Sequence, residues 1–203
     1  MNKIVVIKIG SSLVTDRNDS IDKDFIRSIS SQTRNLIEKG YEVIVVSSGA
    51  IAHGMKSWGI REKPEEIDKL QALSAVGQIG LINAYQDEFR IHGLLAAQVL
   101  MSHSDLKDEE RSKNIQTSLK NIFNLGAIPI INENDSVSTE EIQYGDNDQL
   151  SGEVASLINA NYLIILTDQD GVYKEDPKKK TSNYIMRAET GDKQVKIKDR
   201  VEE

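Results

Sequence analysis

Residues 127–135 read Ala-Ile-Pro-Ile-Ile-Asn-Glu-Asn-Asp, an apolar run that ends in amides and acids. A second polar string, Gly145-Asp146-Asn147-Asp148, follows after a short loop and precedes a helix-like stretch. A strand with polar groups at its carboxyl end, followed by a loop and a helix, is how open α/β sheets build ligand sites. Such side chains offer acceptors for an ammonium group, donors for a carboxylate and oxygens for a metal. We therefore expect a ligand site at this strand end.

Each polar string also has an ordinary structural explanation. Asp146 and Asn147 are residue types that often cap helices, and residues 132–135 could be a polar loop. Either explanation is plausible alone. The occurrence of both strings at neighbouring positions favours a ligand site.

Strand-like and helix-like segments alternate on both sides of this stretch. Continuous runs rich in Ile and Val predict strands buried on both faces, and helical spacing of apolar residues predicts helices. The expected strands are residues 3–9, 41–46, 94–100, 128–131 and 162–166, and the expected helices are 21–39, 67–82, 108–125 and 150–160. This alternation predicts an α/β fold in which helices cover both faces of a mainly parallel sheet.

Composition limits the class of protein. The 203 residues suffice for one sizeable core, with 38% hydrophobic and 28% charged residues, as in a globular protein. No apolar run approaches the roughly 20 residues that cross a bilayer, and the N-terminus lacks a signal-peptide pattern. The absence of cysteine excludes disulfides and fits a cytoplasmic protein. A net charge of −7 without an evident basic face argues against a nucleic-acid partner.

Two further strand ends carry candidate anion-binding residues. Lys8 precedes Gly10 and Ser11, so its ammonium could meet a phosphate close to backbone N–H groups, although a lysine at a strand end can also simply extend into water. The string 47–50, Ser-Ser-Gly-Ala, could bind an anion at a helix N-terminus or form only a tight turn. Neither the P-loop motif nor the dinucleotide fingerprint occurs.

Other polar residues give weaker signals. Asp170-Gly171, after Thr167-Asp168, is an ordinary turn signal. The three histidines, His53, His92 and His103, lack the spacing of metal ligands, so we expect no transition-metal site.

Six strings, in this order along residues 3–177, resemble the glutamate 5-kinases, a family in the amino-acid kinase superfamily. The strings formed by residues 132–135 and 145–148 are the most specific of them, whereas the lysine at the first strand end indicates only the superfamily. The strings are residues 5–12, 45–52, 75–78, 129–135, 145–148 and 166–173.

The resemblance implies an αβα sandwich of the amino-acid kinase type. It implies ATP-dependent phosphorylation of the L-glutamate side-chain carboxylate to glutamyl 5-phosphate, the first step of proline biosynthesis. It further implies Mg²⁺ on the ATP phosphates, feedback inhibition by proline, and association into homodimers or homotetramers.

The resemblance also implies roles for individual residues. Lys8 would hold the transferring phosphoryl group, and Asp148 would orient Lys8. Further contacts to ATP are implied for Gly10, Ser11, Thr167 and Asp168. Contacts to glutamate are implied for Ser48, Gly49, Asp135 and Asn147.

These residue types suit phosphoryl transfer, which needs positioning and charge neutralisation more than covalent chemistry. The glutamate side chain is already ionised at neutral pH because its reference pKa is about 4.3, so no strong base is required. Asp135 suits the substrate ammonium, and Ser48 with the N–H groups near Gly49 suits a carboxylate.

One departure from the family concerns a later segment of the form Gly-Thr-Gly-Gly-Met-x-Thr-Lys, whose lysine is a second phosphate contact. It is not found here; the chain instead continues with Lys178-Lys179-Lys180 and a polar stretch. Loss of one such donor typically lowers the rate about 10²–10³-fold. We therefore expect residues 1–203 to be a single, truncated kinase domain with a divergent polar tail over residues 178–203.

Four alternatives remain open. The chain could be a non-catalytic glutamate- or proline-binding protein, an inactive fragment, or a kinase in which the lysine run replaces the missing lysine. A flexible lysine run is more often a solvated loop. A superfamily kinase for aspartate, carbamate or a nucleotide is disfavoured by the strings at residues 132–135 and 146–148.

Overall fold

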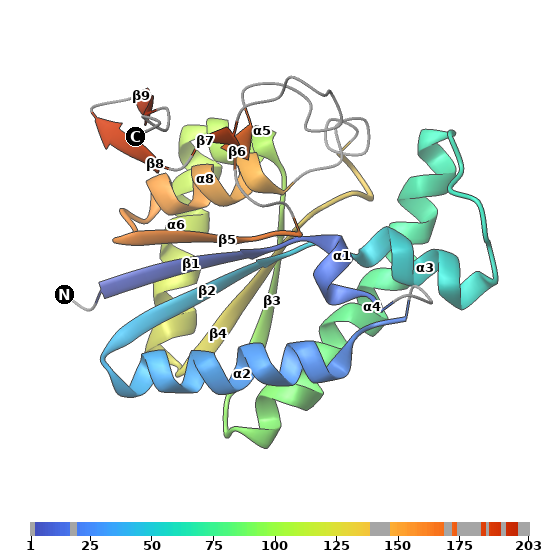
Figure 1. The fold of residues 1–203 in the computed structure, drawn as a ribbon, viewed down its shortest axis with the longest axis horizontal. Coiled ribbons are helices and arrows are strands. Elements are labelled where there is room, and N and C mark those ends of the chain that lie inside the picture. The colour runs from blue at the N-terminus through green and yellow to red at the C-terminus, as the bar shows by residue number, and fades with distance from the viewer. Residues whose placement is uncertain are drawn as a thin grey trace. The chain divides into compact units, whose positions relative to one another are not determined.

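The computed structural model describes residues 3–16, 20–138, 147–168, 172–173, 184–185, 187–191 and 194–198 (Figure 1). They form two units, Met1–Leu166 and Thr167–Glu203, which we describe separately. The elements of the first unit are, in chain order, β1 (Lys3–Ile9), α1 (Ser11–Val14), α2 (Lys23–Glu38), β2 (Tyr41–Ser47), α3 (Ala50–Trp58), α4 (Ile67–Ile91), β3 (Leu95–Met101), α5 (His103–Lys107), α6 (Glu109–Asn124), β4 (Ala127–Glu133), α8 (Asp148–Leu157) and β5 (Tyr162–Leu166).

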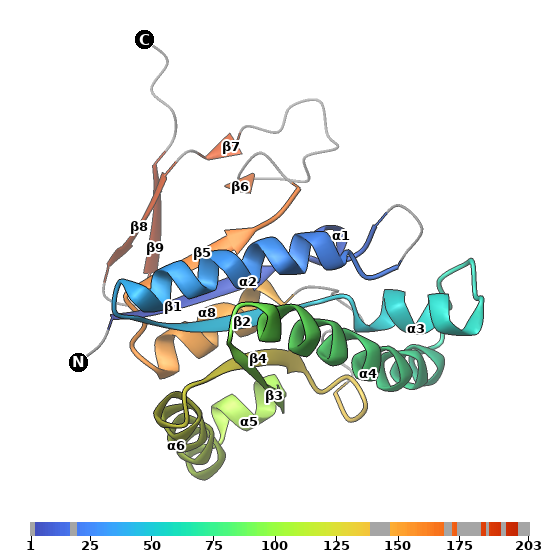
Figure 2. The ribbon, with the colours of Figure 1, turned by 90° about the horizontal axis from the view of Figure 1, so that it is seen from below.

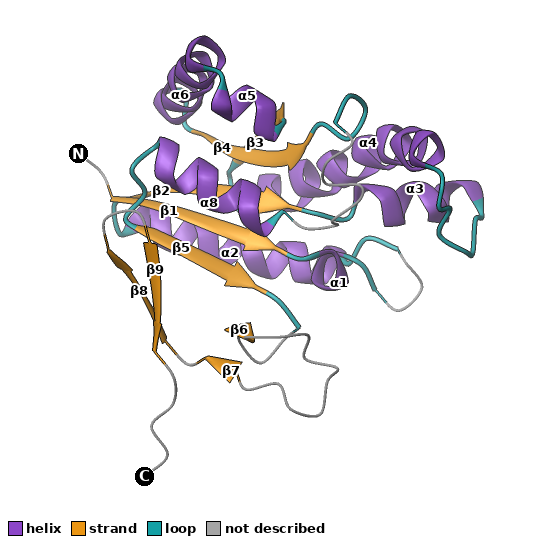
Figure 3. Cartoon of the chain, turned by 90° about the horizontal axis from the view of Figure 1, so that it is seen from above, coloured by secondary structure: helices purple, strands orange, loops and turns teal. Residues whose placement is uncertain are grey.

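The first unit is built on a five-stranded sheet with the strand order β3-β4-β2-β1-β5, which Figure 3 shows from above. All neighbouring strands are parallel. In the central pair, Lys3 lies opposite Tyr41 and Ile9 opposite Ser47, so these two strands end together. The α/β fold with a mainly parallel sheet, predicted from the sequence, is confirmed.

Helices cover both faces of this sheet. Because successive side chains of a strand point to opposite faces, Val5 and Ile7 of β1 pack with α2 and α4, the face seen in Figure 2. Val6 packs with residues of α6 and α8 on the other face. Lys8 is two residues from Val6 on the same strand, so its side chain points to the same face of the sheet, the one that α8 covers.

Most element ends lie within one or two residues of the sequence-based expectation. The Asp22 side chain accepts a hydrogen bond from the Phe25 N–H (2.9 Å) and caps α2. Gly40 follows α2 with a φ of 82°, which favours glycine. The main difference is α4, which extends to Ile91 rather than residue 82. The short helices α1 and α5 were not expected, since four or five residues give no periodic signal.

Helices α3 and α4 approach each other very closely at two glycines. A Cβ atom on Gly77 would lie 1.8 Å from the carbonyl oxygen of Ala50, and one on Gly54 would lie 1.9 Å from that of Leu73. Side chains larger than hydrogen therefore cannot fit unless the backbones move apart. This crossing fixes α4 against the first turn of α3.

The described residues of the second unit include two antiparallel strand pairs. One joins β6 (Val172–Tyr173) to β7 (Tyr184–Ile185), and the other joins β8 (Arg187–Gly191) to β9 (Gln194–Lys198). Much of the expected polar tail, residues 178–203, lies outside the described residues. The prediction of a single domain over the whole chain stays a prediction. Among the described helices, none has the length and apolar character needed to span a membrane.

Candidate active site

A buried lysine and a carboxylate meet at the carboxyl end of the sheet. The Lys8 Nζ lies 2.5 Å from Oδ1 of Asp148, the first residue of α8. Lys8 is only 5% exposed, and a buried ammonium is costly unless it is paired. A carboxylate at the first turn of a helix is in turn favoured by the helix dipole. The structure thus fixes the ammonium at the end of β1, on the face that α8 covers.

The side chain of Asn147 connects three neighbouring segments. Its Nδ2 lies 2.9 Å from each of three acceptors, the Ser47 carbonyl, the Ser48 Oγ and the Asn132 Oδ1. Asn147 is the N-cap residue of α8, but its side chain makes no capping hydrogen bond, so capping does not account for this side chain. Its Oδ1 is buried without a hydrogen-bond partner among the described residues.

The loop between β2 and α3 brings Ser48 and Gly49 to the same place. The Ser48 N–H donates to the Ile9 carbonyl (3.1 Å), which joins the ends of β1 and β2. Gly49 has a φ of 108° and ψ of −2° and is the N-cap of α3. Only glycine adopts this conformation easily, and the turn directs the first N–H groups of α3 toward the strand ends.

Asp135 lies beyond the end of β4 and is held by helix α4. Its Oδ2 accepts a hydrogen bond from the Ser74 Oγ (2.6 Å), and both residues are buried. Burial raises the pKa of the Asp135 carboxyl, while the Ser74 hydrogen bond and the charge of Lys63 act in the opposite direction.

Glu133 is a buried acid that the sequence did not single out. It is 2% exposed, and among the described residues neither carboxylate oxygen has a partner for a hydrogen bond of good geometry. Burial raises its pKa; the Ser138 hydroxyl and His103 lower it, and the Asp135 and Asp105 charges raise it further. By strand alternation it faces α5, where His103 Nδ1 lies 2.7 Å from Glu153 Oε2.

The four residues implied, besides Lys8, to contact ATP have different surroundings. The Gly10 N–H, expected to face a phosphate, donates instead to the Leu166 carbonyl (3.1 Å). Ser11 is exposed at the first position of α1. Thr167 and Asp168 begin the second unit, are exposed, and are joined by a long hydroxyl–carboxylate contact of 3.5 Å. Their predicted role toward the nucleotide stays a prediction.

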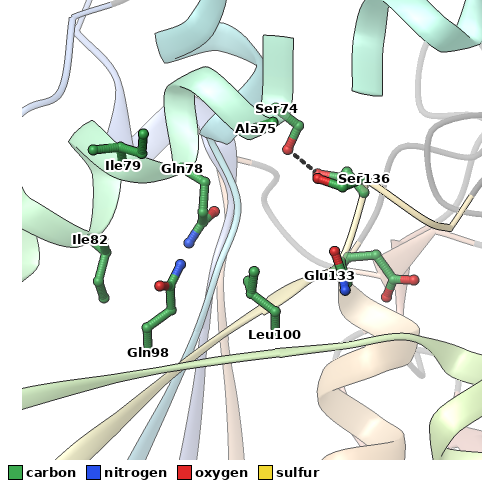
Figure 4. Close-up of a pocket in the computed structure, with 11 residues that line it drawn as sticks. Ser74, Ala75, Gln78, Ile79, Ile82, Gln98, Leu100, Glu133 and Ser136 are labelled. Carbon is green, nitrogen blue, oxygen red and sulfur yellow. Dashed lines mark hydrogen bonds between the residues drawn. The ribbon is translucent and has the colours of Figure 1, made fainter. Parts of the chain in front are cut away.

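A pocket of about 430 Å³ lies between α4, β3 and the end of β4, and Asp135 is one of the residues that line it. Figure 4 shows Gln78 and Gln98 pointing toward one another across it. Ser74 and Asp135, which share a hydrogen bond, both line it. It is lined by Ser74, Ala75, Gln78, Ile79, Ile82, Gln98, Leu100, Glu133, Asn134, Asp135 and Ser136. In the described part of the chain, no group of three or more acidic or histidine side chains is arranged to hold a metal ion.

Comparison with known proteins identifies the class to which this fold and site belong. Residues 3–193 match the model of the amino acid kinase family, and the chain belongs to that family.

The more specific resemblance to glutamate 5-kinases is also confirmed. The chain is 47% identical over 188 residues to glutamate 5-kinase of Methylobacillus flagellatus, which covers 93% of this chain and 50% of that protein. It is 49% identical over 178 residues to glutamate 5-kinase of Burkholderia thailandensis, covering 88% and 48%. The chain therefore spans about half the length of the curated relatives it matches.

Proposed function

We propose that this chain is an ATP-dependent kinase that phosphorylates the side-chain carboxylate of L-glutamate to give glutamyl 5-phosphate, the first step of proline synthesis. The observation that carries the proposal is the juxtaposition of two groups at the start of α8. Asp148 pairs with the buried Lys8, and the preceding Asn147 joins Ser48 and Asn132. A cation for phosphate thus lies next to a polar cluster suited to an amino acid, in a homologue of glutamate 5-kinases.

Lys8 and Asp148 are proposed to act on the transferring phosphoryl group. The Lys8 ammonium is held in one position by Asp148 and shielded by burial, so it stabilises developing charge without reorganising. The attacking group is the substrate carboxylate, which is ionised at neutral pH. No base has to remove a proton from it, so neither residue needs to take one up.

The amino-acid end of glutamate is proposed to lie between Asp135, Asn147 and the start of α3. The buried Asp135 carboxylate and the Asn147 Oδ1, which has no partner in the part of the chain that the structure describes, are both acceptors suited to an ammonium group. The Ser48 hydroxyl and the first N–H groups of α3, beyond Gly49, are donors suited to a carboxylate. The two kinds of group together match the two charges of an α-amino acid.

The nucleotide is proposed to bind beyond the ends of β1 and β5. Because the Gly10 N–H donates to the Leu166 carbonyl, the role proposed for Gly10 is steric. A Cβ there would lie 3.9 Å from the Lys8 Nζ, where a phosphate has to approach. Contacts to the nucleotide are also proposed for Ser11 and, separately, for Thr167 and Asp168, which directly follow β5 in the sequence.

Mg²⁺ is proposed to enter on the nucleotide phosphates rather than in a protein cage. The described residues hold no cluster of ligands of their own for a metal, and Mg²⁺ commonly binds through substrate phosphates with few protein carboxylates. When bound, it would neutralise phosphate charge.

Proline and a second copy of the chain are the further proposed partners. Proline carries an α-carboxylate and a ring ammonium at the positions of the two α-groups of glutamate, so it can compete for Asp135, Asn147 and Ser48. A homodimer or homotetramer is proposed from the resemblance to the family.

The proposal is tested by incubating the chain with ATP, Mg²⁺ and L-glutamate and trapping the acyl phosphate with hydroxylamine. Glutamate-dependent hydroxamate and ADP in equal amounts are expected. The substrate panel includes aspartate, which is expected to give no product. A folded chain that yields hydroxamate with aspartate but not with glutamate would contradict the proposed substrate.

A second candidate function is a glutamate or proline sensor without turnover. It rests on the polar cluster of Asp135, Asn147 and Ser48, which suits an α-amino acid whether or not a phosphoryl group is transferred. Calorimetry distinguishes the two functions: a sensor binds glutamate or proline in a titration, yet forms no hydroxamate at any ATP concentration.

A further inference from the structure

Helix α4 reaches the candidate site through a chain of three buried amides. The Gln78 Oε1 accepts a hydrogen bond from the Asn132 Nδ2 (2.8 Å), and the Asn132 Oδ1 accepts one from the Asn147 Nδ2 (2.9 Å). The three residues are between 3% and 9% exposed. The path therefore runs from α4 through the end of β4 to the residue before α8 without crossing bulk water.

The direction of these hydrogen bonds is fixed at both ends. The Glu133 N–H also donates to the Asn132 Oδ1 (2.9 Å), so this oxygen has to be an acceptor and the Asn132 amide points its NH₂ group at Gln78. At the other end, the Ser47 carbonyl can only accept, and it requires the NH₂ group of Asn147. The result is that the Asn147 Oδ1 remains available as an acceptor.

The same helix face holds the carboxylate of the site. Ser74 precedes Gln78 by four residues, one helical turn, so both lie on one side of α4. The Ser74 Oγ donates to the Asp135 Oδ2 at 2.6 Å. Figure 4 shows Ser74 and Gln78 on α4, above the end of β4. One turn of α4 thus contacts both acceptors proposed for the substrate ammonium, one directly and one through Asn132.

The intervening Gly77 explains why this turn is well placed to orient other groups. Its missing side chain lets α4 lie against the Ala50 carbonyl, at the first residue of α3. Since Gly49 and the α3 N-terminus belong to the same candidate site, α4 is fixed to one side of the site by backbone contact. Ser74 and Gln78 then hold the other side by hydrogen bonds.

We propose that Ser74 and Gln78 are positioning residues that set the orientation of Asp135 and Asn147 for the ammonium group of the amino acid. This inference rests on the proposed function for the identity of the ligand. Neither residue touches Lys8 or Asp148 in the described contacts, so their effect falls on amino-acid affinity and not on ATP. Loss of either hydrogen bond is expected to weaken glutamate binding about tenfold.

The test uses the whole chain with Gln78→Leu and Ser74→Ala. Gln78→Leu removes the acceptor at similar size, and Gln78→Glu restores an acceptor in its place. Matched controls come from residues away from the site. Gln116→Leu removes a helix glutamine that donates to the Leu157 carbonyl (2.8 Å), and Ser30→Ala removes a buried serine hydroxyl in α2.

Two measurements are made on each variant. The first is the NMR signal pair of the Asn147 side-chain NH₂ without ligand, which is assigned by its loss in Asn147→Asp. The second is calorimetric affinity for L-glutamate and, separately, for the non-hydrolysable analogue AMP-PNP with Mg²⁺. We expect Gln78→Leu to shift or broaden the NH₂ pair and to weaken glutamate about tenfold, with the affinity for the analogue changed less than about twofold. Gln78→Glu recovers most of the glutamate affinity, and both controls resemble the wild type.

Ser74→Ala provides an independent measurement should Gln78→Leu fold poorly. It is expected to weaken glutamate by a similar factor while leaving the Asn147 signals in place, because Ser74 acts on Asp135. An unmoved Asn147 pair in Gln78→Leu, or equal losses for glutamate and the nucleotide analogue in either variant, overturns the inference. If the wild type binds no glutamate while the Asn147 pair still shifts in Gln78→Leu, the proposed substrate is wrong and the hold of α4 on Asn147 is supported.

Discussion

Lys8 and Asp148 form a pair whose members differ in burial, and this difference gives each substitution a distinct expected effect. The Lys8 side chain is 7% exposed, and that of Asp148 is 41% exposed. Lys8→Met removes the buried charge and leaves a carboxylate that water can reach, so the fold is retained. Hydroxamate formation is expected to fall at least about 10²–10³-fold, as for loss of a preorganised charged donor. Thermal unfolding and glutamate affinity are measured alongside and should change little.

Asp148→Asn is the reciprocal control. It keeps the ammonium buried while removing the carboxylate beside it, and breaking a buried pair from that side is destabilising. We expect a loss of about 1–3 kcal/mol in the free energy of unfolding, larger than that of Lys8→Met. Equal stability of the two variants would contradict this account of the pair.

Asp135 gives the candidate site an expected pH dependence. Burial raises its pKa above the ordinary value of 3.8, and only the ionised form attracts an ammonium group. Glutamate affinity is therefore expected to fall on acidification at a pH higher than an ordinary aspartate would require. Calorimetry between pH 4 and 7 on the wild type and on Asp135→Asn, which should bind weakly with a flatter profile, measures this contribution.

The raised pKa of Asp135 affects the stability of the fold in the opposite direction from its effect on glutamate affinity. Because the folded-state pKa is raised, the contribution of Asp135 to stability is fully present below its unfolded pKa and is lost as pH rises through the folded value. Glu66→Gln serves as the control in these pH titrations. Glu66 is a surface carboxylate whose pKa is lowered by its hydrogen bond with Lys69, so its loss should not change the acid limb of glutamate affinity. An acid limb of glutamate affinity that is identical in wild type and Asp135→Asn would exclude this residue as its origin.

At the scale of the elements, the crossing of α3 and α4 leads to a stability prediction. Gly77→Ala places a methyl group 1.8 Å from the Ala50 carbonyl oxygen, so one helix has to move. We expect a loss of about 1–3 kcal/mol or more in the free energy of unfolding, as for overpacked interiors. Urea denaturation followed by circular dichroism measures it, and weaker glutamate binding should accompany the loss.

Gly152→Ala is the matched control for this prediction. Gly152 lies within α8, and a Cβ there would meet nothing within 4 Å. The same substitution should therefore raise stability by up to about 1 kcal/mol through helix propensity alone. A Gly77→Ala variant as stable as Gly152→Ala would show that the two helices do not meet as described.

The sequence predicted the elements well where one local pattern was decisive. The apolar runs of β1, β2 and β5 located the strands because they alternate with helices of clear period. Site residues at the ends of these strands followed from the rule that parallel strands present their carboxyl ends at one edge. Lys8, near the end of β1, is an example, and it was weighed against a lysine extending into water. Asn147 was instead proposed from its place directly before a helix and was weighed against a helix cap.

Hydrogen-bond partners that lie far apart in the chain could not be predicted from local sequence patterns. Asn147 bonds to Ser47, 100 residues away, whereas the helix-cap interpretation used only adjacent positions. Ser74 was missed, and Gln78 appeared only within the string of residues 75–78 with no role of its own, because α4 has a broad apolar surface in which single polar residues look incidental. A usable signal existed, namely two polar residues one turn apart on either side of a glycine, but their partners became evident only from the fold.

At the scale of the whole molecule, the outer strands of the sheet differ from what their sequences suggest. The residues of β5 are apolar on both faces, as expected for a strand inside a sheet, yet β5 is the last strand in the described order. Four of its residues are 38–50% exposed: Tyr162, Leu163, Ile164 and Ile165. At the opposite edge, Leu95 and Leu100 of β3 are also exposed. Exposed apolar outer strands favour association with other chains.

We therefore expect the chain to self-associate as its concentration rises, and expect Ile164→Lys to reduce this association. A lysine on an outer strand opposes further strand pairing because the new strand would have to bury its charge. Sedimentation velocity across a concentration series measures the effect. Leu125→Lys adds the same charge at a residue 79% exposed beyond the end of α6, so it controls for the change in net charge. If both variants associate like the wild type, β5 is not the contact, and the β3 edge becomes the surface to change next, through Leu100→Lys.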